Sequence, residues 1–141
     1  MYDRILFPTD GSRAAESAAP HAFSHAERYD AALHVLHVVD ESESAAIVGR
    51  AEDPRAALDE RTEESMSAIV DEAEERDLRV TAEVRVGTPH RTILSYADER
   101  DVDLVVMSTR GRSGVGRVVM GSVTERVVRM GDTPVVAVQR E

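Results

Sequence analysis

The sequence predicts an α/β domain of three layers, in which an open parallel sheet of five strands is covered by helices on both faces in a Rossmann-like architecture. Two observations predict this class. Short apolar runs alternate along the chain with longer amphipathic segments, as in strands joined by helical crossovers. A glycine-rich stretch, residues 108–122, leads from an apolar run into a helical segment. No linker or internal repeat is apparent in the 141 residues, so we expect one domain over residues 1–141.

The first strand and helix are predicted from the opening residues. Residues 5–7 form an unbroken apolar run that a Pro-Thr-Asp-Gly sequence closes, which is typical of a central buried strand. An Ala-rich helix is expected from Ser12 to about Tyr29, with Asp10 or Ser12 as its N-cap. Pro20 falls inside this segment and predicts a kink or a shifted helix boundary.

The next elements are a strand at residues 33–39, a small and acidic loop at 41–53, and a second helix. Asp53 and Pro54 are typical of a helix start, with aspartate as the cap and proline in the first turn. An apolar stripe then continues this helix to about Arg76.

The second half of the chain repeats the alternation. In residues 80–86 apolar and polar side chains alternate, which predicts a strand with one wet face at an edge of the sheet. Thr88 and Pro89 then start a helix that runs to about Arg100, with threonine as the cap. The remaining predicted elements are a strand at 104–107, a helix at 121–129 and a strand at 134–138.

Chain order and the glycine-rich stretch point to one crevice. In open parallel sheets ligands bind beyond the carboxyl ends of the strands where the strand order reverses, and a flavodoxin-like or related order places the first and fourth strands there. Glycines let backbone N–H groups approach a ligand closely, and a helix N-terminus offers unpaired donors with partial positive charge. Arg110, Arg112 and Arg117 add fixed charge. The sequence therefore predicts a site for a phosphate-bearing ligand.

Two common nucleotide motifs are not present. The stretch from Gly116 to Ser122 resembles a Walker-type loop but lacks its lysine and follows a late strand. Gly111, Gly114 and Gly116 do not have the dinucleotide spacing, and no acidic residue follows at the required interval.

Composition excludes several classes of function. The chain has no cysteine, which excludes disulfides and thiolate chemistry, and its net charge of −10 argues against nucleic acid as a partner. All 17 basic residues are arginine, set against 27 acidic residues, which indicates adaptation to high salt or, alternatively, GC-rich codon bias. No apolar run approaches a membrane span and Met1–Arg4 lacks a signal-peptide pattern, so we expect a cytoplasmic protein without a membrane partner.

The histidines give weak catalytic or metal signals. His21 and His25 share a helix face but lack a third ligand nearby, and His34 and His37 face opposite sides of a strand. His90, in the first turn of a helix, would approach the crevice. We expect neither catalytic residues nor a dedicated protein metal site.

The motif order resembles the universal stress protein family. Nucleotide-binding members carry Gly-x2-Gly-x9-Gly-Ser/Thr between the fourth strand and the last helix, and here Gly111 and Gly121-Ser122 match its latter part, while Ser108 stands at the first glycine. The resemblance covers nearly the whole chain and extends to the segments Ile5–Asp10, His37–Asp40, Val86–Pro89, Gly121–Glu125 and Thr133–Val138.

The resemblance implies the strand order 3-2-1-4-5 and a site for ATP, with Mg²⁺ or Mn²⁺ held mainly by the phosphates. It places Asp10 by the ribose, with Pro8 and Thr9 on the pocket floor. Val38 would offer its backbone to adenine and Met107 would pack against the base. A side chain at Ser108 would either crowd the ribose or hydrogen-bond to it. The remaining implied binding residues, chiefly for the phosphates, are Arg110, Gly111, Gly114, Gly121, Ser122, Val123 and Thr124.

Each assignment has a purely structural alternative. Ser122 and Glu125 form the Ser-x-x-Glu pattern of a capping box, and Asp10 would serve as a helix cap without any ligand. Gly114 would serve loop flexibility, and the arginines would pair with acidic neighbours.

Three functions therefore remain open. The first is an ATP-binding regulatory or stress-response protein. The second is a dimeric interaction module that binds no nucleotide, which Ser108 favours. The third is a slow ATP hydrolase, for which no general base stands out. A homodimer is expected through the strand Val135–Val138, because this apolar edge carries no charge that would block pairing with a second copy.

Overall fold

The computed structural model describes residues 2–41, 58–110 and 121–139 of the chain. In chain order the elements are β1 (Arg4–Pro8), α1 (Arg13–Tyr29), β2 (Ala32–Asp40), α3 (Glu60–Glu75), β3 (Val80–Gly87), α4 (Pro89–Glu99), β4 (Leu104–Ser108), α5 (Ser122–Met130) and β5 (Val135–Val138).

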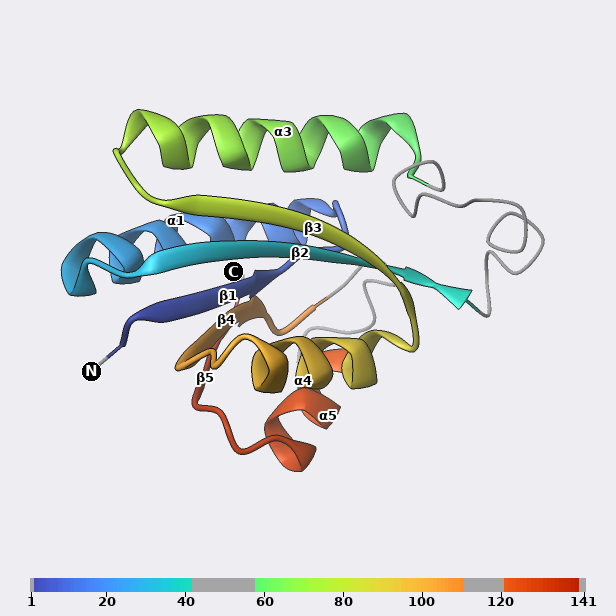
Figure 1. Ribbon diagram of the computed structural model, residues 1–141. Helices are drawn as coiled ribbons and strands as arrows, with labels where there is room; N and C mark the ends of the chain where they lie inside the picture. Colours follow the sequence, from blue (N-terminus) through green and yellow to red (C-terminus); the bar gives the residue numbers. More distant parts are fainter. Residues whose placement is uncertain (1, 42–57, 111–120, 140–141) are drawn as a thin grey trace.

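The five strands form one parallel sheet in the order β3-β2-β1-β4-β5. Helices α1 and α3 lie on one face and α4 and α5 on the other, so the domain has three layers (Figure 1). The predicted class and strand order are confirmed. Residues 80–86 lie at an edge, as their alternation indicates, and the order reverses between β1 and β4.

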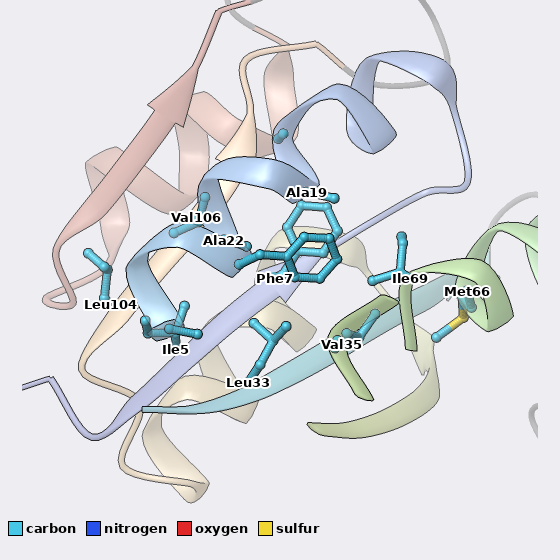
Figure 2. Close-up of a cluster of buried hydrophobic side chains, with 14 of the residues drawn as sticks. Ile5, Phe7, Ala19, Ala22, Leu33, Val35, Met66, Ile69, Leu104 and Val106 are labelled. Atoms are coloured by element: carbon cyan, nitrogen blue, oxygen red, sulfur yellow. The ribbon is translucent and has the colours of Figure 1, made fainter. Parts of the chain in front are cut away.

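Alternate side chains of the central strands supply two separate cores. Ile5 and Phe7 of β1 point to the α1 and α3 face and pack there with Leu33 and Val35 of β2 (Figure 2). Leu6, between them, joins a second cluster under α4 and α5. The central strands are therefore apolar on both faces, which explains their unbroken apolar runs in the sequence.

Helix α1 shows which of its two candidate caps is used. The Ser12 hydroxyl accepts a hydrogen bond from the Ala15 N–H at 3.1 Å, so Ser12 is the N-cap. Pro20 lies within one continuous helix that keeps its expected boundaries. The proline ring is on the exposed face, while Ala18, Ala19 and Ala22 are buried against the sheet. Packing of the alanine face therefore holds the helix together across the proline.

Helix α3 begins later than its sequence signal. Asp53 and Pro54 lie outside the described residues, but Leu58 and Asp59 are not helical and the helix starts at Glu60. The Asp59 carboxylate caps it by accepting from the Thr62 N–H at 2.7 Å. The prediction of one helix from residue 54 to 76 is wrong at its start, because a second aspartate acts as the cap.

In the described part of the chain, no helix is long and apolar enough to cross a membrane.

Candidate functional site

The loop after β1 is fixed to the neighbouring strand β2. The Thr9 N–H donates to the Leu36 carbonyl oxygen at 2.9 Å, and the Thr9 carbonyl oxygen lies 2.8 Å from Nδ1 of His37. A carbonyl oxygen only accepts, so Nδ1 of this buried histidine carries the proton. His37 therefore holds Pro8 and Thr9 at the carboxyl edge of the sheet. The sequence gives no signal of this contact, because its partners are 28 positions apart.

Gly11 brings helix α3 against the same loop. Its φ is +80°, in the left-handed region, and a Cβ there would lie 2.8 Å from Thr62 Oγ1 and 3.1 Å from Thr62 Cα. Glycine is therefore required at this close approach. Arg61 adds a bond from its Nε to the Gly11 carbonyl oxygen at 3.4 Å. Half-buried Asp10 accepts from the Ser12 N–H at 2.9 Å, so its carboxylate lies in the turn that starts α1.

Ser108 ends β4 and joins two segments of the site. It is 4% exposed, and its hydroxyl oxygen accepts from the Arg110 N–H at 3.1 Å. Its carbonyl oxygen accepts from the Thr124 hydroxyl at 2.7 Å, which ties α5 to the end of β4. Met107, one position earlier, is buried in the second core cluster. The serine in place of a glycine is thus accommodated by a bond to its own loop.

The start of α5 differs from the predicted capping box. Gly121 is the N-cap and no side chain of the described residues caps the helix, while Ser122 is its first residue and is exposed. The Glu125 carboxylate pairs with Arg129 at 2.7 Å instead of reaching back. The capping-box prediction is wrong because the helix begins at Ser122, one residue earlier than the box requires, and the N-cap is Gly121, whose N–H donates to the Thr109 carbonyl oxygen at 2.5 Å. Within the described part of the chain, the first N–H groups of α5 accordingly have no side-chain cap.

The register brings these segments to one end of the sheet. Pro8 pairs with Leu36, so β2 runs past β1 and half-buried Val38 lies further along the carboxyl edge. Gly111 and Gly114 lie outside the described residues. The predicted site residues that the structure gathers at the carboxyl edge are Pro8, Thr9, Asp10, Val38, Met107, Ser108, Arg110, Gly121, Ser122, Val123 and Thr124.

The described residues show no preformed metal site. Within residues 2–41, 58–110 and 121–139, no three His, Cys, Asp or Glu side chains are placed to hold an ion. His25 is close to His21, but its Nδ1 lies 2.8 Å from the His21 carbonyl oxygen, which is a contact within the helix.

Away from the carboxyl edge of the sheet, His34 and Tyr96 form a buried pair. Nδ1 of His34 lies 2.7 Å from the Tyr96 hydroxyl, and the two rings meet edge to face at 5.6 Å. The guanidinium groups of Arg85 and Arg100 lie over the Tyr96 ring, 4.7 and 5.3 Å from its centre. Both arginines also pair with Glu83, and Arg100 does so at 3.0 Å. Burial, and then the charges of Arg100 and Arg4, lower the pKa of His34, while Glu83 opposes them.

His90 lies in the first turn of α4, which follows β3 at the carboxyl edge of the sheet. The residue is 8% exposed. Burial lowers the pKa of His90, and the charges of Arg126, Arg91 and Arg129 lower it further. The predicted approach of this histidine to the carboxyl edge is consistent with its position.

A parallel sheet whose order reverses between β1 and β4, with polar loops and a helix N-terminus at that point, defines an α/β protein of the class that binds ligands at the reversal. The chain belongs to the universal stress protein family, whose model matches residues 1–139.

Two curated relatives come from Methanocaldococcus jannaschii. Universal stress protein MJ0531 is 34% identical over 142 residues, covering 99% of this chain and 84% of that protein. Universal stress protein MJ0577 is 30% identical over 157 residues, covering 100% of this chain and 97% of that protein. The solved structure of MJ0577 superposes with a TM-score of 0.87 at 32% identity, covering 100% of this chain and 98% of that chain.

Other solved structures of the family hold nucleotides. A universal stress protein in complex with cAMP has a TM-score of 0.70 at 23% identity, covering 97% of this chain and 96% of its own. The protein from Archaeoglobus fulgidus in complex with dAMP has a TM-score of 0.71 at 21% identity and covers 97% of both chains. At these identities the likeness concerns the fold alone.

Proposed function

We propose that this protein binds ATP in the crevice at the ends of β1 and β4 and acts as a regulatory or stress-response protein. The observation that carries the proposal is the start of α5, where Gly121 caps the helix without a side-chain bond and Ser122 is exposed. Unpaired N–H groups at a helix N-terminus suit phosphate. Family members in complex with cAMP and dAMP support an adenine nucleotide as the ligand.

The roles expected from the family follow the two sides of the crevice. Asp10, in the turn before α1, would bind the ribose, and Val38 would offer its backbone to the base. The N–H groups of Ser122 and Val123 would bind the phosphates. The Thr124 hydroxyl already donates to the Ser108 carbonyl oxygen, so Thr124 would support phosphate binding indirectly, by fixing the first turn of α5. Mg²⁺ or Mn²⁺ would be held mainly by the phosphates.

The Gly121→Val variant tests this proposal. Gly121 has φ −57° and ψ 147°, which valine also adopts, so the fold should survive while the added side chain blocks approach to the helix start. Calorimetry with ATP and magnesium in molar potassium chloride should show binding by the native protein and none by the variant. Ser24→Val, on the exposed side of α1, is the matched control and should bind as the native protein does.

Absence of ATP binding by the native protein at millimolar nucleotide would favour the second function, an interaction module without nucleotide. The specific observation for that function is Ser108, whose hydroxyl closes onto Arg110 at 3.1 Å. We propose that the protein is not an enzyme beyond very slow ATP hydrolysis. Release of phosphate at many turnovers per minute by the purified protein would contradict this.

We further propose a homodimer through β5. This strand is at the edge of the sheet. In the single chain Val136 is half-buried and Ala137 is exposed. The preceding helix α5 also leaves Val128 48% and Met130 54% exposed. Antiparallel pairing of two β5 edges would satisfy both. Light scattering should give a dimer that Val136→Asp disrupts, because the aspartate would be buried without a partner. A native monomer at micromolar concentration would contradict the proposal.

The composition carries two further proposals, a cytoplasmic location and adaptation to high salt. Screening of repulsion at a net charge of −10 should raise the melting temperature from low to molar potassium chloride. A flat or falling melting temperature would remove the argument for salt adaptation.

A further inference from the structure

We propose that the first turn of α4 and Arg126 of α5 form a subsite for the outer phosphates of the nucleotide, so that the crevice prefers a triphosphate to a monophosphate. The inference rests on the proposed function and names residues outside the glycine-rich motif. Its starting point is a local excess of positive charge in a chain whose net charge is −10.

The first turn of α4 carries basic residues where helices usually carry acidic ones. Aligned peptide dipoles make a helix N-terminus positive, so acidic residues are favoured there and basic ones are not. The other described helices each carry an acidic residue in the first turn, whereas α4 carries none. His90 and Arg91 stand there instead, and Thr88 makes no side-chain capping bond. This turn is therefore electropositive and lacks an internal anion among the described residues.

His90 is open to a ligand although the residue is largely buried. It is 8% exposed, and no ring nitrogen has a hydrogen-bond partner in the described part of the chain. No fully buried side-chain nitrogen there lacks a partner, so the ring nitrogens of His90 must reach the surface. A buried ring with unused polar atoms at the surface is the expected arrangement for contact with a ligand.

Arg126 links this turn to the start of α5. It is exposed and lies four positions after Ser122, so the two residues share one face of the helix. Helical side chains lean toward the N-terminus, which carries the guanidinium group toward the proposed phosphate site. Helices α4 and α5 lie side by side (Figure 1), and Gly131 at the end of α5 closely approaches Leu94 of α4. The two helix starts are thereby held on one side of the sheet, at its carboxyl edge.

Two arginines near His90 differ from several other described arginines, which are held in ion pairs. Arg76, Arg85 and Arg100 each pair with glutamates. Within the described residues Arg91 and Arg126 make no ion pair. Arg129, the third positive charge near His90, is already paired with Glu125, so we do not include it in the subsite. Two free guanidinium groups suit the charge that β- and γ-phosphates add to a nucleotide.

Binding of ATP and of AMP to the same full-length variants tests the subsite. Calorimetry should show that Arg126→Gln and Arg91→Gln each weaken ATP binding about tenfold, the worth of one charge-assisted hydrogen bond, and leave AMP binding unchanged. Arg28→Gln makes the same charge change at the far end of α1 and should alter neither. Circular dichroism checks that each variant is folded.

The outcomes separate the two proposals. If AMP and ATP bind the native protein but Arg126→Gln and Arg91→Gln weaken both equally, or neither, the subsite is wrong and the proposed function stands. If the native protein binds neither nucleotide, the proposed function is wrong and the subsite falls with it. A selective loss of ATP affinity in both variants supports the subsite.

Discussion

Two buried histidines lie near the two ends of helix α4, and they differ in whether their side chains have hydrogen-bond partners. His34 contacts Tyr96 near the end of α4, and His90 lies in its first turn. Each is 8% exposed, and in each case burial and then nearby arginines lower the pKa of the ring. Burial and charge alone therefore do not distinguish them.

Their partners do distinguish them. His34 is hydrogen-bonded to Tyr96, and Glu83 lies between the two arginines that cover the tyrosine ring. Among the described residues the His90 side chain forms no hydrogen bond, and Arg91 and Arg126 pair with no carboxylate. We call His34, Tyr96, Glu83, Arg85 and Arg100 the closed group, because their polar side chains pair with one another, and His90, Arg91 and Arg126 the open site. The closed group stabilises the fold, whereas the open site is suited to binding an anion.

The largest expected effect is the loss of Tyr96. This side chain is fully buried in the second core, so Tyr96→Ala should lower the free energy of unfolding by about 3–5 kcal/mol. Urea denaturation measures it. Tyr29→Ala, at a side chain that is 41% exposed, is the control and should cost roughly 1 kcal/mol. Equal losses in the two variants would mean that the closed group is not a centre of stability.

A smaller effect isolates the hydrogen bond. Tyr96→Phe keeps the ring between its arginines but leaves His34 Nδ1 buried without a partner, which should cost about 1–3 kcal/mol. The matching change at the other end, His90→Gln, breaks no side-chain hydrogen bond within the described residues and should cost less, roughly 1 kcal/mol. The same denaturation curves give both values, and a reversed order would contradict the comparison.

The closed pair should also make the fold sensitive to acid. Because the pKa of His34 is lowered in the folded state, the unfolded state binds more protons below its ordinary value of 6.5. Stability is therefore full above that pH and falls as the pH drops through it toward the folded pKa. Denaturation from pH 8 to 5 should show this fall, and His34→Gln should make it shallower. An unchanged slope would assign the acid sensitivity to other groups, of which His90 acts in the same direction.

The smallest expected effect is at the open site. Burial, and then the charges of Arg126, Arg91 and Arg129, lower the pKa of His90, and phosphates bound among the arginines would offset their charge. Addition of ATP should therefore raise the pKa of His90, while AMP should leave it in place. Proton NMR of the imidazole resonances measures both shifts, with His25 on α1 as the internal reference. An equal shift with AMP would contradict the separation of inner and outer phosphates.

Much of this molecule was accessible from its sequence. The alternation of apolar runs and helices predicted the layers, whereas the ligand site indicated by the glycine-rich stretch stays a prediction. The exact starts of the helices were harder to predict, because several neighbouring polar residues can each act as the N-cap. Ser12 rather than Asp10 caps α1, and Asp59 rather than Asp53 caps α3 as the structure describes it. At α5 the Gly121 contact with Thr109 placed Ser122 inside the helix and removed the capping box.

The sequence by itself determined the class, the strand order through its family, and the edge of the sheet at which polar loops gather, because these follow from local patterns of apolar and glycine residues. Only the tertiary structure decided that His37 holds Thr9 and that His34 contacts Tyr96, 62 positions away. It also decided that Arg91 of α4 and Arg126 of α5 form no ion pair within the described residues. The physical reason is that a hydrogen bond or ion pair depends on positions in space. Those positions are fixed when separate strands and helices pack on one sheet, and no local spacing along the chain records them.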